Sequence, residues 1–70
     1  MAEIKIHYDR LVGTLTVYFD DPSLESVSEE TGEEVILMKD TAGRVIGLEK
    51  LNFHLASKEG LRYSIEELVA

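Results

Sequence analysis

Alternating polar and apolar residues near the start of the chain predict a β-hairpin. Residues 3–8 alternate strictly, which is typical of a half-buried strand. A turn over residues 9–13 follows, and residues 14–19 are rich in β-branched and aromatic side chains that favour a returning strand. The apolar side chains of the two strands should then share one face: Ile4, Ile6, Tyr8, Leu15, Val17 and Phe19.

A break and a weaker strand come next. Residues 20–23 contain Pro22, which cannot donate to a sheet ladder and disfavours helix in the residue before it. Residues 24–29 alternate only weakly and are charged, so we predict a short edge strand that its charges protect from aggregation. Residues 29–33 form a polar turn.

The second hairpin is the centre of the pattern. Val35–Met38 is apolar at every position, so both faces of that strand should be covered. Residues 40–43 suit a type I turn with Asp first and Gly last, where a bulge is common. Residues 45–49 return, and Gly47 inside that strand indicates either a bend or the close approach of another backbone.

The last part of the chain suggests a small helix. Residues 52–60 fit either one or two helical turns ended by Gly60 or the end of a strand. Ser64–Glu67 has the pattern of a capping box, and Tyr63 and Leu68 occupy the positions of a hydrophobic staple. These features predict a short C-terminal helix that packing has to hold.

Together the segments predict a mainly β protein of the α+β class, with residues 1–70 as one domain. We expect a single antiparallel sheet of about five short strands, arranged as hairpin, edge strand and hairpin, with the short C-terminal helix. So short a helix cannot hide one face of such a sheet. Either the sheet curls into a half-barrel or two chains stack their sheets, and we favour the homodimer.

Charge narrows the choice of partners. The chain has 14 acidic and 7 basic residues, a net charge of −7, and no lysine or arginine between Arg10 and Lys39. Half of the acids lie in that gap: Asp20, Asp21, Glu25, Glu29, Glu30, Glu33 and Glu34. Nucleic acids and anionic membranes select clustered cations, so both are excluded as partners. The seven acids are candidate contacts for a basic protein partner, and the alternative is an acidic surface that serves only solubility.

The sequence shows no cysteine, no apolar leader and no stretch of membrane-spanning length. Disulfides and cysteine-based zinc sites are therefore excluded, and we predict a cytoplasmic protein. His7 and His54 are the only histidines, at no recognised metal spacing, so we expect no metal and no cofactor. Asp9 and Glu49 are the one carboxylate pair worth testing as an active or ligand site, helped by His54. The plain alternative is a turn-forming aspartate and a strand glutamate.

Several residues in order resemble a known bacterial family. They are Tyr8-Asp9, then Leu15 and Val17, then the block Gly43-Arg44-Val45-Ile46-Gly47-Leu48-Glu49. This pattern, over about residues 4–56, resembles the family catalogued as domain of unknown function 2283. Gly13 and Ala42 stand where members of that family usually carry acids. The resemblance implies a small β-rich fold, no established activity and, for some members, a role as neutralising partners of toxin-like proteins.

Three hypotheses about function follow from the sequence. The first is a non-catalytic interaction module whose acidic segment meets a basic partner, in some family members a toxin-like protein. The second is a small enzyme or ligand-binding protein that uses Asp9 and Glu49. The third is a structural homodimer without ligand. The sequence names no partner, substrate or biological process.

Overall fold

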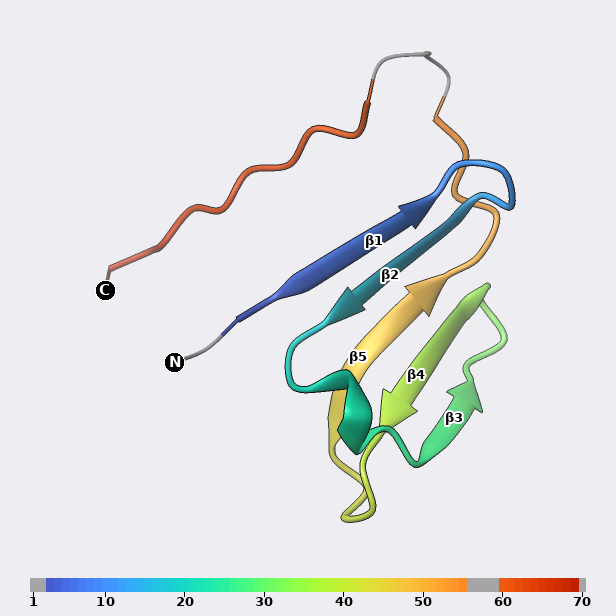
Figure 1. Ribbon diagram of the computed structural model, residues 1–70, viewed down its shortest axis with the longest axis vertical. Coiled ribbons are helices and arrows are strands. Elements are labelled where there is room, and N and C mark those ends of the chain that lie inside the picture. The colour runs from blue at the N-terminus through green and yellow to red at the C-terminus, as the bar shows by residue number, and fades with distance from the viewer. Residues whose placement is uncertain (1–2, 56–59, 70) are drawn as a thin grey trace.

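The chain forms one five-stranded antiparallel sheet in a computed structural model that describes residues 3–55 and 60–69 (Figure 1). The strands are β1 Lys5–Asp9, β2 Thr14–Tyr18, β3 Val27–Glu30, β4 Val35–Lys39 and β5 Val45–Lys50. Their order across the sheet is β1-β2-β5-β4-β3. The predicted sequence of hairpin, edge strand and hairpin is confirmed, and the second hairpin joins the first through pairing of β2 with β5.

Cross-strand register sorts the side chains onto two faces. Directly paired residues of an antiparallel sheet project from the same side. Ile6 pairs with Val17, Val17 with Leu48, and Leu48 with Leu37, which gives an apolar row across four strands. Rows on either side extend it, and we call this side the apolar face: Ile6, Tyr8, Leu15, Val17, Val27, Val35, Leu37, Val45 and Leu48.

The opposite face is covered in part by the connection from β2 to β3. This connection runs past β5 and β4 to reach β3, and it contains the 3-10 turn η1 (Pro22–Leu24), which contacts β5 (Figure 1). Tyr18 lies on the same side as Met38, and its hydroxyl donates to Glu25 Oε1 at 3.4 Å just after η1. The connection therefore crosses on the Met38 side. Met38 and Ile46 are the only fully buried apolar residues in the described part of the chain.

The predicted C-terminal helix is wrong. Residues 60–69 have no regular secondary structure, and Figure 1 shows them as an open trace that passes outside β1 without joining the sheet. Ile65 and Leu68, which should have packed, are 76% and 89% exposed. Nucleating a helix is costly, and a capping box cannot offset that cost in so short a segment without tertiary contacts.

The structure decides the conformation of the ambiguous segment 52–60 only in part. Residues 52–55 are neither helix nor strand. They run beside the β1–β2 turn, where the Phe53 N–H donates to Gly13 O at 2.7 Å. Phe53 also packs edge-on against Tyr8, with ring centroids 5.7 Å apart. The prediction for residues 56–59 lies outside the described residues.

Candidate interaction surface

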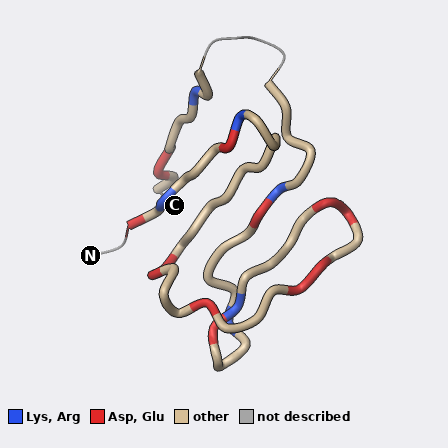
Figure 2. Tube along the Cα trace, turned by 45° about the vertical axis from the view of Figure 1, so that its right-hand side comes forward, with Lys and Arg blue, Asp and Glu red and all other residues tan. Residues whose placement is uncertain are grey.

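The seven acids of the segment 20–34 follow one path along the fold. They lie on the connection from β2, on β3 and in the turn to β4, and all seven are exposed. In Figure 2 the acidic stretches of β3 and of the turn to β4 lie together at one edge of the sheet, whereas the acidic stretch that follows β2 lies apart from them. The acids are clustered in one segment of the sequence, and the sheet order brings only the acids on β3 and in the turn after it to an edge.

Some of these acids stabilise the fold locally. Asp21 Oδ1 accepts from the Ser23 N–H at 2.9 Å and so caps η1. That backbone hydrogen bond lowers the pKa of Asp21 below its usual value. Glu25 also accepts from Ser28 Oγ at 3.2 Å, and Glu29 forms an ion pair with Lys39. These carboxylates have structural roles in addition to any contact with a partner.

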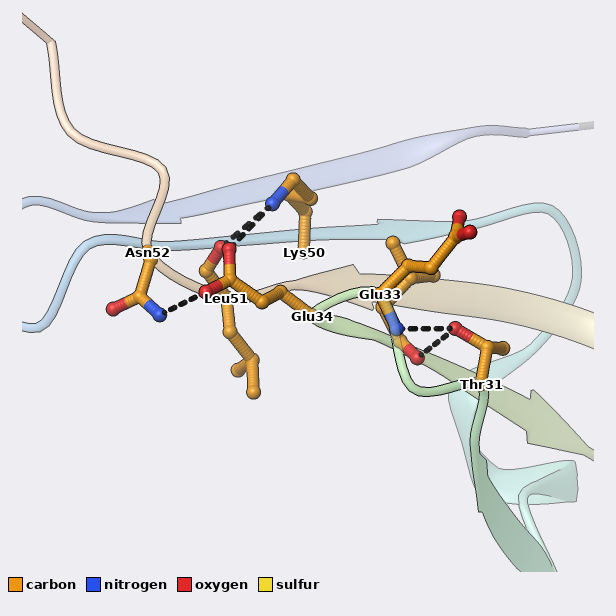
Figure 3. Close-up of polar contacts among 7 residues, drawn as sticks. Thr31, Glu33, Glu34, Lys50, Leu51 and Asn52 are labelled. Atoms are coloured by element: carbon orange, nitrogen blue, oxygen red, sulfur yellow. Dashed lines mark hydrogen bonds and ion pairs between the residues drawn. The ribbon is translucent and has the colours of Figure 1, made fainter.

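Glu34 belongs to a polar cluster that ties the start of β4 to the end of β5 (Figure 3). Its Oε1 accepts from Asn52 Nδ2 at 2.9 Å, and its Oε2 lies 3.4 Å from Lys50 Nζ. Lys50 Nζ also donates to Leu51 O at 2.9 Å. The hydrogen bond from Asn52 and then the one from Lys50 lower the pKa of Glu34. No local pattern could have revealed this cluster, because Glu34 and Asn52 are 18 residues apart.

β3 offers an open backbone edge next to the remaining acids. The Thr31 N–H donates to Val35 O at 3.1 Å. In an antiparallel pair the backbone groups of every second residue point toward the partner strand, so the N–H and C=O groups of Glu29 and Val27 also face β4. The N–H and C=O groups of Ser28 and Glu30 then point away from the sheet. No described strand pairs with this edge.

A hollow of about 490 Å³ adjoins the first residues of β3. Ser26 and Val27 line it on one side, and Asp40 and Thr41 of the β4–β5 turn line it on the other. It is open to solvent rather than enclosed. Such a surface suits an extended peptide segment better than a small molecule, which requires a cleft that buries most of its area.

Tyr8 and Asp9 of the family pattern shape the end of the first hairpin. The Tyr8 hydroxyl accepts from the Leu55 N–H at 3.3 Å. Asp9 Oδ1 accepts from the N–H groups of Leu11 and Val12, at 3.0 and 3.1 Å. Both side chains therefore hold backbone segments in place.

Asp9 and Glu49 share the face opposite the apolar face but lie apart. Asp9 pairs with Thr14, and Glu49 pairs with Thr16 on the same strand. β2 separates them by two strand spacings, about 10 Å. The His54 ring sits against Gly13 in the β1–β2 turn, which is the turn that follows Asp9. The carboxylate of Asp9 is already engaged by the turn.

Gly43 and Arg44 belong to the β4–β5 turn, which Asp40 organises. Asp40 is buried, and its Oδ1 accepts from the N–H groups of Ala42 and Arg44, each at 2.9 Å. The Arg44 Nε donates to Asp40 Oδ2 at 2.9 Å, and the Gly43 N–H donates to Asp40 O at 3.0 Å. Gly43 has a φ of +80°, which favours glycine at this position. The register shifts beside this turn, at Met38 and Lys39, as the predicted bulge requires.

We expect the ionisation of Asp40 to make the free energy of unfolding depend on pH. The Arg44 N–H first, and then the Arg44 side chain and the Ala42 N–H, lower the pKa of Asp40 below its usual value despite burial. Since the pKa is lower in the folded state, the carboxylate stabilises the fold above about pH 4, and this contribution is lost as the pH falls through the folded-state pKa.

Urea unfolding at several pH values checks this expectation. Asp40→Asn should be less stable than the parent at neutral pH, and the difference should shrink steadily on acidification. Glu33→Gln makes the same charge change in an exposed turn and should track the parent at every pH. A difference for Asp40→Asn that stays constant across the pH range would contradict the role assigned to its charge.

Gly47 and Glu49 sit on β5, the central strand. A Cβ on Gly47 would lie 2.6 Å from Val17 O and 3.0 Å from Met38 Cε, so a side chain has no room there. The sequence allowed two interpretations of Gly47, a bend or the close approach of another backbone. The structure shows the close approach, by the backbone of β2. Glu49 is half-buried and pairs with Thr16 and Ile36.

Within the described residues, no group of three or more histidine, aspartate or glutamate side chains is arranged to hold a metal ion. His7 lies on β1 with its ring 6.2 Å from that of Tyr18. The described part of the chain also contains no helix long and apolar enough to cross a bilayer.

Residues 5–53 match the family described as "Protein of unknown function (DUF2283)". The matched span holds all five strands and ends before residues 60–69. No curated protein and no solved structure matches the chain. Because the match covers well over half of the sequence, the chain belongs to the DUF2283 family of proteins of unknown function.

Proposed function

We propose that this protein is a non-catalytic, cytoplasmic interaction module that binds an extended basic segment of a partner protein along β3. The observation that carries the proposal is the combination at this edge of unpaired outward backbone groups with acidic side chains. Extended segments recognise such edges by adding a strand, and main-chain hydrogen bonds then supply affinity whatever the sequence.

Side chains at the edge give this binding its selectivity. Glu30 and Glu33 lie at and just beyond the end of β3, and no ion pair within the described residues engages them. Val27 is exposed at the start of the same strand, ahead of these charges. A segment that alternates basic and apolar residues fits this edge, and an acidic segment is repelled.

Edge strands often carry charge simply to prevent aggregation, which is the competing explanation of the acids on β3. The two explanations differ in what they predict for a basic strand. If the charges serve only to repel, a basic peptide gains nothing specific at β3. If the edge is a binding site, the peptide should order on β3 and leave β1, the other edge, unchanged.

Amide NMR of the labelled full chain tests the proposal with a short peptide of alternating lysine and valine. We expect the amides of Ser28 and Glu30 to shift and to exchange more slowly on titration. Raising the salt from about 50 to about 500 mM should weaken binding. The corresponding glutamate–valine peptide should not bind.

A double variant, Glu30→Gln with Glu33→Gln, should weaken binding about threefold or more, because two favourable charges are lost. Glu66→Gln with Glu67→Gln makes the same net charge change in the C-terminal segment and should bind like the parent. The proposal fails if the peptide does not bind at about 1 mM. It also fails if the amides of β1 respond as strongly as those of β3, or if both double variants behave alike.

A further inference from the structure

The exposed apolar side chains of the sheet all project from one side. Ile6 on β1 is 39% exposed, and Val27 on β3 at the other edge is 55% exposed. Val27 pairs with Lys39, which in turn pairs with Val45. Ile6 pairs with Val17, which in turn pairs with Leu48 on the central strand. These residues therefore lie on the apolar face, which continues from one edge of the sheet to the other.

The described residues provide little cover for this face. The β2–β3 connection crosses the opposite side, where Met38 is buried. On the apolar face, Phe53 packs on Tyr8 at one corner. Tyr63 and Leu68 of the C-terminal segment do not cover it, since they are 73% and 89% exposed. A sheet with one uncovered apolar face requires a second layer.

Each lysine on the apolar face is paired with a glutamate, although the whole chain carries −7. Pairing places Lys39 and Lys50 on this side together with Glu29. Lys39 forms an ion pair with Glu29, and Lys50 forms one with Glu34. A highly acidic or basic partner would find no complementary charge here, whereas a second copy of the same neutral apolar surface meets no repulsion at the contact.

We infer that two copies of the chain stack their apolar faces and form a two-layered sandwich around a two-fold axis. Five strands about 4.8 Å apart and about five residues long give a flat face of about 400 Å² per copy, before side-chain relief is added. With that relief, the pair comes close to the roughly 1,000 Å² that a specific interface needs, which indicates a dimer of modest affinity. This inference does not rest on the proposed binding at β3, because the edge of the sheet stays free in the stacked pair.

Sedimentation equilibrium of the full chain between about 5 and about 500 µM tests the inference. We expect the mass to rise with concentration from that of one chain to that of two. Ile6→Lys on β1 and Val27→Lys on β3 should each raise the dissociation constant about tenfold or more, because each places an unpaired charge in the contact.

Matched controls change the neighbouring residue, whose side chain projects from the opposite side. His7→Lys and Ser28→Lys add a lysine to the same strands and should dimerise like the parent. Circular dichroism verifies that all four variants retain the sheet. The inference is overturned if the parent protein stays monomeric at about 500 µM. It is also overturned by a dimer that responds to only one edge, or that responds equally to changes on both faces, because neither pattern fits stacked sheets.

Discussion

Gly47→Val is expected to abolish cooperative folding or to lower the free energy of unfolding by more than about 3 kcal/mol. A Cβ at this position would lie 2.6 Å from the carbonyl oxygen of Val17 and 3.1 Å from Tyr18 Cδ1. The first contact is with backbone, so β5 would have to move away from β2, and these are the two strands through which the hairpins join. A chain of this length has only about 4–10 kcal/mol of stability in total. Thermal unfolding followed by circular dichroism provides the measurement.

Two smaller substitutions separate this steric cause from loss of backbone freedom. Gly47→Ala already introduces the Cβ and should lower the melting temperature markedly. Gly32→Ala adds a Cβ in open space at a φ of +86°, so only backbone strain is added, at about 1 kcal/mol. If Gly47→Ala were as mild as Gly32→Ala, the close contact between β2 and β5 would not explain why glycine stands at this position.

Ile46→Ala should lower the free energy of unfolding by about 3 kcal/mol, because its side chain is 2% exposed and its loss leaves a cavity. Ile46 and Met38 are the fully buried apolar side chains of the described residues, so the fold has few other contacts to compensate. Urea unfolding at neutral pH measures the change.

The neighbouring residue supplies the control for Ile46. Val45 lies on the same strand and is 45% exposed, so Val45→Ala should cost less than about 1 kcal/mol. Dimerisation would raise that cost, since Val45 is on the apolar face. Equal losses for the two variants in monomeric protein at low concentration would show that Ile46 is not the centre of the core.

The hairpins were predictable because both depend on short-range patterns. Alternation in β1 and β2 fixed which side chains share a face, and Asp40 with Gly43 marked the turn that the structure shows. The same local turn chemistry explains Asp9, whose carboxylate accepts from the two following amides of its turn. The acidic composition of the β3 region was equally plain from the sequence.

The prediction of a C-terminal helix was wrong because it used only local sequence patterns, whereas the stability of so short a helix depends on tertiary contacts. Ser64 and Glu67 fit a capping box, yet the side chain of Ile65 remains mostly exposed in the structure. A capping pattern raises helix content only where tertiary contacts offset the cost of nucleation. The sequence contained no information about those missing contacts.

The sequence by itself determined the two hairpins, their turns and the charge of the segment between Arg10 and Lys39, because each follows from residues close together in the chain. It placed the edge strand at residues 24–29, whereas β3 is Val27–Glu30 and Leu24 ends the 3-10 turn. Tertiary structure alone decided that β2 pairs with β5, that β3 becomes an edge, and that Glu34 meets Asn52. Those choices depend on how two hairpins align and on which face the β2–β3 connection crosses. The physical reason is that long-range pairing is selected by the packing of the whole sheet, so the free edge of β3 and the uncovered apolar face appear only when the strands are assembled.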